Sequence, residues 1–320
     1  MDDRHAPPDL ARWSLHCFCL GARSTPQRVA RLDNNGRLLH SAVGGTTIGS
    51  LREQGLDVTE SQLWLLSTYG LIELKGDQIE TTFPMLGPRA VATVRSTAES
   101  TAWAVVDEAG RKAGEIGSTL AEFDLEGDGF AVVFGHALDG VIWDLLRQRG
   151  GVPDVSLDLL NPLWRGVFWA LYPGRPGSAG TNELAGDGSA LIMVWDEDSA
   201  DGLRSLAATP GLGESLGTLQ AGATRQVIPD VGPIPVVEEG GRLDNLSRDL
   251  AQVVVDQVPS PGQSKSIVEE AGVAASVEEA TVIVAHEVVW ALSELLIGSG
   301  ALTAPVGGGV EGRLFVRLDT

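Results

Sequence analysis

Two histidines, each close to a carboxylate, are the residues of this sequence best suited to acid–base chemistry. His136 precedes Asp139 in the segment VFGHALDGVIWDLLRQRG, and His286 adjoins Glu287 in the segment VIVAHEVVWALSELLIGSG. Histidine side chains titrate near neutral pH, and carboxylates can share their proton transfers. If the two segments line one cleft, these four residues could be the catalytic groups of a cofactor-independent hydrolase or isomerase.

A tryptophan accompanies each histidine on a predicted helix. At about 100° per residue, His136 and Trp143 fall opposite the apolar stripe of the first helix, and His286 and Trp290 do the same on the second. Trp143 and Trp290 could therefore form the apolar wall of a binding site. The alternative is structural, with both helices buried on two sides and each histidine hydrogen-bonded. The shared pattern could also mark an ancient duplication, although helical periodicity alone produces such matches.

A second candidate site is the aromatic segment NPLWRGVFWALY at residues 161–172. If it is helical, Trp164 and Phe168 share a face because they are four residues apart, and Trp169 follows directly. This segment could form an apolar groove for a peptide or a small organic ligand. Arg175, in the glycine-rich stretch that follows, could then meet a carboxylate or a phosphate. The alternative is a helix that packs in the core between two domains.

Metal and cofactor sites are not predicted. The two cysteines, Cys17 and Cys19, would share one face of a strand, but a single pair implies no disulfide framework. A zinc site would need two further ligands at suitable spacing, so we expect small apolar thiols in a buried strand. The strand–GxGxxG–helix, P-loop and GxSxG motifs are missing from the sequence. We therefore expect no cofactor.

The segment from Ile48 to Phe83 reads as helix, turn, helix and β-hairpin. Thr59 and Gln62 have the spacing of a capping box, which predicts the start of the second helix, and Gly70 is a natural helix end. The sequence KGD at 75–77 suits a turn between two short strands. In this order the segment resembles the winged-helix domains of bacterial regulators. The resemblance implies a small helical unit with a β-hairpin wing and, in such regulators, DNA binding.

The charges of this segment argue against DNA binding. A recognition helix presents Arg, Lys, Asn or Gln to the major groove, whereas residues 59–69 hold one Gln and no Lys or Arg. The predicted hairpin carries Glu73, Lys75, Asp77 and Glu80, which sum to a negative charge. The whole chain has a net charge of −20, from 23 basic and 43 acidic residues, and this charge repels nucleic acid and anionic membranes. We expect neither as a partner.

Two classes of function remain open. The first, which the aromatic faces and the missing cofactor motifs favour, is a binding module. In it, a winged-helix-like unit without DNA contacts recognises a peptide, a protein or a small organic ligand in an aromatic groove. The second is the hydrolase or isomerase described above.

A chain of 320 residues with 43% hydrophobic composition predicts about two globular domains of the α+β class. The first, residues 1–150, would combine a β-hairpin, the winged-helix-like unit and a helical part. The second, residues 151–320, would be a mixed α/β domain with Gly/Pro-rich loops. Further predicted elements are a strand at 13–20, hairpin strands at 28–32 and 37–40, helices at 89–123, 130–149, 245–258 and 277–297, strands at 190–195, 226–228, 234–237 and 312–318, and a flexible linker at 259–266.

The sequence predicts a cytoplasmic location. Its N-terminal stretch, MDDRHAPPDLARW, lacks the apolar region of a signal peptide. No uninterrupted apolar run approaches the length of about 18 residues expected of a transmembrane helix. The high content of Gly, Ala, Val and Arg is typical of a bacterial genome rich in G and C.

Overall fold

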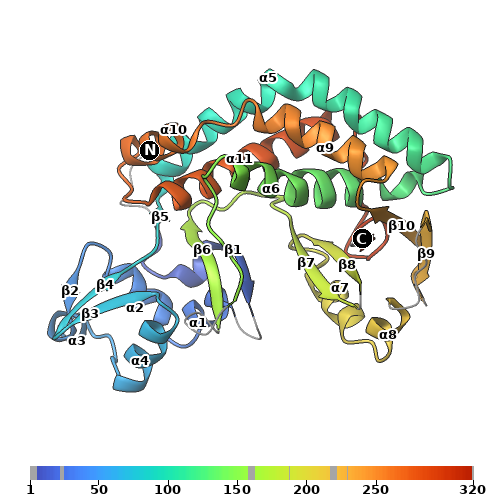
Figure 1. Ribbon diagram of the computed structural model, residues 1–320. Coiled ribbons are helices and arrows are strands. Elements are labelled where there is room, and N and C mark those ends of the chain that lie inside the picture. Colours follow the sequence, from blue (N-terminus) through green and yellow to red (C-terminus); the bar gives the residue numbers. More distant parts are fainter. Residues whose placement is uncertain are drawn as a thin grey trace. The chain divides into compact units, whose positions relative to one another are not determined.

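The computed structural model describes residues 6–21, 25–157, 163–186, 188–216, 222–228 and 230–318. Over these residues the chain forms both helices and sheets, which confirms the α+β class (Figure 1). It divides into two compact units: unit 1 comprises Met1–Thr97, Gly150–Arg175 and Pro259–Ala285, and unit 2 comprises Ala98–Arg149, Pro176–Val258 and His286–Thr320. The predicted division at residue 150 is one of the crossing points. Each unit also takes segments from the other half of the chain.

The first part of unit 1 is a set of short helices and a small antiparallel sheet. The helices are α2 (Asn35–Ser41), α3 (Ile48–Glu53) and α4 (Glu60–Thr68), and the strands are β2 (Thr46–Thr47), β3 (Ile72–Lys75) and β4 (Gln78–Thr81), in the order β2-β4-β3. In chain order they read helix, strand, helix, helix and hairpin. The two helices and the hairpin predicted between Ile48 and Phe83 are therefore present.

Helix α4 begins at the predicted capping box. The Thr59 hydroxyl accepts from the Gln62 amide at 3.2 Å, and the Gln62 side chain accepts from the Thr59 amide at 3.5 Å. Two free amides of the first turn are satisfied in this way. Leu63 and Leu66 are buried beneath the helix. Gly70 follows with a φ of +63°, a conformation that favours glycine at a helix end.

The second sheet of unit 1 has the strand order β1-β6-β5, formed by β1 (Ser14–Gly21), β6 (Trp164–Leu171) and β5 (Met85–Leu86). β1 pairs with β6 antiparallel along its whole length, from Ser14 opposite Leu171 to Gly21 opposite Trp164. β5 pairs with β6 in parallel. The remaining elements of the unit are η2 (Leu10–Arg12), α1 (Pro26–Ala30) and α10 (Pro261–Glu270).

Three predictions for unit 1 are wrong. The aromatic segment at 161–172 was expected to be helical, but from Trp164 onward it is the central strand of a sheet. Its apolar residues 167–171 are buried on both faces of that strand. The expected hairpin at 28–40 is instead the helices α1 and α2, and Asn35 donates from Nδ2 to the Val29 carbonyl between them. The expected linker at 259–266 forms the start of α10, which Ser260 and Gln263 cap reciprocally.

Unit 2 contains a five-stranded sheet in the order β7-β8-β11-β10-β9. Its strands are β7 (Gly180–Ala185), β8 (Ser189–Trp195), β9 (Arg225–Ile228), β10 (Gly232–Glu238) and β11 (Leu314–Leu318). β10 and β11 are parallel, and the other pairs are antiparallel. All strands except β7 were predicted, and these predictions are confirmed.

Unit 2 contains helices on both faces of this sheet, with η4 (Ala131–Val141) on one face and α7 (Ala200–Ala207) and α8 (Leu212–Leu216) on the other. The other helices are α5 (Pro88–Ala121, which begins in unit 1), η3 (Glu126–Asp128), α6 (Ile142–Gln148), α9 (Arg242–Val255) and α11 (Val277–Gly298, which also begins in unit 1). The four long helical segments predicted from periodicity are confirmed. Side chains alternate along the strands. Leu191 and Met193 pack with α7 and α8, whereas Val194 faces η4.

Two helical segments are long and apolar enough to cross a membrane, Glu126–Gln148 and Val277–Gly298. Within the described residues, however, 72% and 83% of their most apolar windows are buried inside the protein. Their apolar side chains are therefore accounted for by contacts within the chain, as in core helices.

Gly135 marks the closest approach of η4 to the sheet. A Cβ atom at this position would lie 2.5 Å from Cγ2 of Val194 and 3.0 Å from Cε1 of Phe315. We expect Gly135→Ala to lower the free energy of unfolding by about 1–3 kcal/mol through overpacking, as measured by urea denaturation. Gly114→Ala is the matched control. It lies on α5 with no atom within 4 Å of its Cβ position, so we expect it to stabilise the chain by about 0.5–1 kcal/mol. Equal effects of the two substitutions would contradict this packing.

Candidate functional site

His136 lies on η4, where the backbone forms a π-helix over Ala131–Val141. π-Helical turns are rare in proteins, and those that occur are often found at functional sites. The contacts of the His136 and Asp139 side chains on this helix therefore decide whether the two can act as acid–base groups. His136 is only 7% exposed, and its Nε2 lies 2.9 Å from Oδ1 of Asp244. Its ring meets Phe315 edge-on, with the ring centroids 5.6 Å apart. Its carboxylate partner is therefore Asp244, on α9, and not the nearby Asp139.

Asp244 is buried and accepts several hydrogen bonds. Its other carboxylate oxygen, Oδ2, accepts from the Gly240 amide at 2.9 Å and from Nε of Arg248 at 2.8 Å. Burial alone would raise the pKa of Asp244, but the hydrogen bonds from His136, Arg248 and Gly240 outweigh it and hold the pKa well below its usual value. This arrangement fixes the start of α9 to η4. Sequence reasoning missed Asp244 because 108 residues separate it from His136.

Asp139 occupies a different environment on the same helix. Its Oδ1 accepts from the Trp143 indole at 3.1 Å, and its Oδ2 accepts from the Thr181 hydroxyl at 2.9 Å. Burial raises the pKa of Asp139 to about 6 in spite of these two donors. A carboxyl group with this pKa has the near-neutral titration that general acid–base catalysis requires.

The helix faces that lie opposite the two apolar stripes, and that carry Trp143, His286 and Trp290, do meet. The rings of Trp143 and His286 are 4.4 Å apart between centroids, and those of His286 and Trp290 are 5.3 Å apart. The Trp290 indole donates to the Ala179 carbonyl at 2.8 Å. Ala179 and Thr181 flank Gly180, the first residue of β7. The contacts therefore run from Asp139 through Trp143 and His286 to Trp290. One end is hydrogen-bonded to Thr181 and the other to Ala179, at the start of β7.

These contacts describe a packed core more closely than a catalytic cleft. Trp143 is 5% exposed, His286 7%, Trp290 3% and Glu287 1%. His136 contacts Asp244 and Phe315, and His286 lies between two tryptophans. Asp139 is partly exposed at the surface of this core, and its pKa is raised toward neutrality.

The aromatic residues of β6 are also core residues. Phe168 and Trp169 are buried, at 2% and 0% exposure, and pack on Phe83 and His16 with ring centroids 4.6 and 5.4 Å apart. Trp164 is partly buried, and its indole donates to the Tyr69 carbonyl at 2.9 Å. Arg175, in the glycine-rich stretch that follows, is buried as well. Of these four residues, Trp164 is the one that stays partly exposed.

The two cysteines differ from expectation. Cys17 and Cys19 form a disulfide within β1, and both are partly exposed. The prediction of buried free thiols is therefore wrong, because two side chains on one face of a strand bring their sulfur atoms together where the Cα atoms lie 5.6 Å apart. Among the described residues, no group of three or more His, Cys, Asp and Glu side chains could hold a metal ion.

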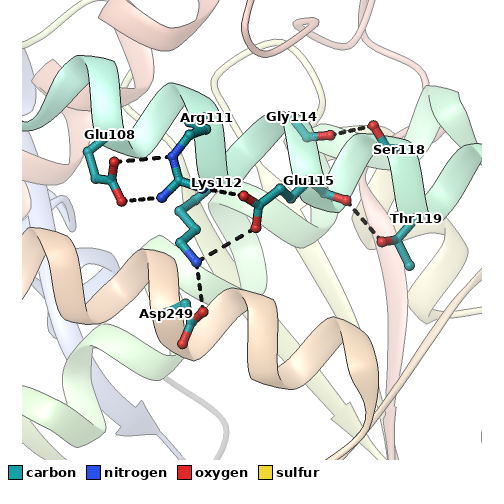
Figure 2. Close-up of polar contacts among 8 residues, drawn as sticks. All are labelled: Glu108, Arg111, Lys112, Gly114, Glu115, Ser118, Thr119 and Asp249. Atoms are coloured by element: carbon teal, nitrogen blue, oxygen red, sulfur yellow. Dashed lines mark hydrogen bonds and ion pairs between the residues drawn. The ribbon is translucent and has the colours of Figure 1, made fainter.

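A hollow of about 470 Å³ lies between α5 and α9 in unit 2, lined by Arg111, Gly114, Glu115, Ser118, Thr119, Arg242 and Leu246. Figure 2 shows the charged ladder beside it: Arg111 pairs with Glu108 and Glu115, and Lys112 lies 2.7 Å from Asp249 on α9. Arg242 pairs with Glu122 at 2.7 Å. Each cation already has a carboxylate partner, so this hollow offers no excess positive charge to an anionic ligand.

The most exposed tryptophan lies at a second hollow, on α4 of unit 1. This hollow is a shallow depression, open to solvent, with a volume of about 700 Å³, and is lined by Glu60, Ser61, Trp64 and Leu65. Trp64 is 69% exposed, whereas Leu63 and Leu66 on the opposite side of the helix are buried. Trp64 was not among the residues that the sequence singled out as a site. Its angular position outside the Leu63–Leu66 stripe was the available signal.

Exposed tryptophans are costly to leave in water and are enriched at protein interfaces. Trp64 and Leu65 give the α4 face an apolar centre, and Glu60 and Ser61 give it a polar edge. This composition suits recognition of a protein surface. Comparison with protein-family models, with characterised proteins and with solved structures gives no match for this chain, so the geometry of the α4 face alone supports the assignment that follows.

Proposed function

We propose that unit 1 carries a winged-helix-like module that binds a basic, apolar segment of a partner protein on the exposed face of α4, and that it does not bind DNA. The observation that carries this proposal is the 69% exposure of Trp64 beside a hollow. The proposal keeps the cytoplasmic location predicted from the sequence.

The arrangement of elements supports a winged-helix-like shape. α2, β2, α3 and α4 are followed by the hairpin β3–β4, and the sheet order β2-β4-β3 places the hairpin beside the short strand that precedes α3. In this comparison α4 takes the place of the recognition helix. Its exposed face is the surface that DNA-binding relatives of this shape would turn toward the major groove.

The side chains on that face favour a protein partner. Trp64 and Leu65 offer apolar contact area, which DNA phosphates and base edges use poorly, and no Lys or Arg lies on α4. Glu60 lines the hollow, and exposed Glu73, Asp77 and Glu80 follow on the hairpin. These negative charges repel phosphate groups and attract cations. The complementary ligand is therefore a peptide segment with Lys or Arg next to an apolar side chain.

Selection of binding peptides from a random library tests this proposal. A phage-displayed library of random peptides would be selected on the full chain, and the enriched peptides would be synthesised and titrated by fluorescence anisotropy. We expect enriched peptides to combine basic and apolar residues and to bind more weakly at higher ionic strength. Trp64→Ala should weaken binding by roughly 30-fold, which corresponds to the loss of about 2 kcal/mol typical of an interface hot spot.

Trp103→Ala provides the control variant. Trp103 lies on α5 in unit 2 and is 65% exposed, so its replacement removes an equally exposed indole from a different surface. We expect this variant to bind the selected peptides as the unchanged chain does. Acidic enriched peptides, affinity that survives Trp64→Ala, or tight binding of a DNA duplex by the full chain would each overturn the proposal.

A further inference from the structure

The disulfide of β1 is a feature that the proposed binding function does not use. Cys17 and Cys19 are the two cysteines of the chain, and one residue separates them. A disulfide stabilises a fold mainly by closing a loop in the unfolded chain, and this effect grows with loop length. The loop here is about the shortest that a disulfide can close, and the pairing of β1 with β6 already fixes its backbone. Stability is therefore a poor explanation for this bond.

The opposite strand comes very close to the backbone of Cys19. Gly166 on β6 pairs with Cys19 and has a φ of +143°, a conformation that side-chain-bearing residues rarely adopt. A Cβ atom at Gly166 would overlap the carbonyl oxygen of Phe18 and approach Cα of Cys19 to 2.8 Å. Only glycine fits at this position opposite Cys19. The close approach of the two backbones therefore depends on Gly166.

The two sulfur atoms have different neighbours. Directly opposite residues in an antiparallel pair place their side chains on the same face. Phe168 stands opposite Cys17, which also packs against the core of unit 1, whereas glycine stands opposite Cys19. Cys19 therefore has no side chain across from it, and both cysteines are partly exposed. An attacking thiol would reach the sulfur of Cys19 more easily than that of Cys17.

We propose that Cys17 and Cys19 form a thiol–disulfide exchange site whose co-reactant is a dithiol. Accessible disulfides are the ones that exchange, and the rate depends on which sulfur can be attacked. A thiolate of the dithiol attacks Sγ of Cys19, the bond between Cys19 and Cys17 breaks, and Cys17 leaves as a thiolate that takes up a proton. The second thiol of the dithiol then attacks the mixed disulfide and releases Cys19. Two electrons and two protons pass to the cysteine pair, and the dithiol becomes a disulfide.

Redox titration of the unchanged full chain tests this proposal without any variant. The chain would be equilibrated in buffers of reduced and oxidised dithiothreitol, quenched with acid, alkylated and weighed by intact mass spectrometry. We expect a reversible change between no and two alkylated cysteines per chain while the circular dichroism spectrum of the folded protein is retained. Two thiols that stay reduced in oxidised dithiothreitol, or a disulfide that is reduced only after the chain is unfolded in urea, would overturn the proposal.

Single replacements test the assignment of the attacked sulfur. Cys17→Ser leaves Cys19, and Cys19→Ser leaves Cys17, so each variant has one thiol that can form a mixed disulfide with oxidised glutathione. We expect the thiol of the first variant to react several-fold faster than that of the second, because access limits the rate. Equal rates, or a faster reaction of Cys17, would refute attack at Cys19. Urea denaturation of each variant confirms that the comparison is made on folded protein.

Discussion

Asp244→Ala is expected to lower the free energy of unfolding by about 3–5 kcal/mol at pH 7, the range found when one partner of a buried charged pair is removed. Asp244 is 2% exposed, and its two carboxylate oxygens accept from His136, Gly240 and Arg248. The substitution leaves the buried His136 ring without its acceptor, whereas Gly240 and Arg248 lie nearer the solvent. Urea denaturation followed by circular dichroism measures the loss.

The same carboxylate should give the stability a defined dependence on pH. The folded-state pKa of Asp244 lies below the value of 3.8 expected of an ordinary Asp. Its stabilising contribution is therefore fully present above about pH 5. It is lost as the pH falls through the unfolded-state pKa of 3.8 toward the folded-state pKa. Asp244→Asn removes the ionisation while keeping the shape. We expect the difference between the unchanged chain and this variant to be constant above about pH 5 and to shrink in acid.

Asp249→Ala is the matched control for Asp244→Ala. Asp249 lies on the same helix, α9, and pairs with Lys112 at 2.7 Å, but its side chain is 59% exposed. Exposed ion pairs contribute little to stability, so we expect this variant to lose less than about 1 kcal/mol. If Asp244→Ala cost as little as Asp249→Ala, the tie between η4 and α9 would not have the structural role assigned to it.

Local signals predicted much of the fold, because they act within one element. The capping box of Thr59 and Gln62, the glycine end at Gly70 and the apolar periodicity of four long helical segments each specify structure over a few turns. The helical wheel also placed Trp143 and His286 on the faces that meet. These features need no knowledge of the rest of the chain.

The contacts between distant segments could not be predicted in the same way. Nothing in the spacing of the sequence relates His136 to Asp244, since their pairing depends on how α9 packs against η4. The candidate surface at Trp64 was missed for a related reason. A tryptophan next to an apolar stripe is compatible with burial or exposure, and the choice depends on which elements cover the helix. Composition therefore identified the aromatic residues but not which of them reach the surface.

The segment that became β6 shows how one wrong element changes a predicted site. In a helix, Trp164 and Phe168 lie on one face and could form a groove, whereas in a strand the two faces alternate and both can be covered. Short apolar runs do not distinguish these cases by periodicity. The pairing of β6 with β1 on one edge and β5 on the other decided it. Trp169 is consequently a core residue, and its replacement gives the sharpest test of that assignment.

Trp169→Ala is expected to lower the free energy of unfolding by about 3–5 kcal/mol, the cost of removing a fully buried large aromatic side chain. Trp169 is 0% exposed and stacks on His16 at an interplanar angle of 23°. The loss combines the removed apolar area with the cavity left in the central strand of the sheet. It should appear as a lower midpoint of urea denaturation with little change in slope.

Trp64→Ala, made in the same unit, is the control for this prediction. Because Trp64 is 69% exposed, its replacement should change the free energy of unfolding by no more than about 0.5 kcal/mol while it abolishes most of the peptide binding. Folded Trp169→Ala protein should bind the selected peptides with unchanged affinity. Reversed results, with Trp169→Ala stable but defective in binding, would return the ligand site to β6 and remove it from α4.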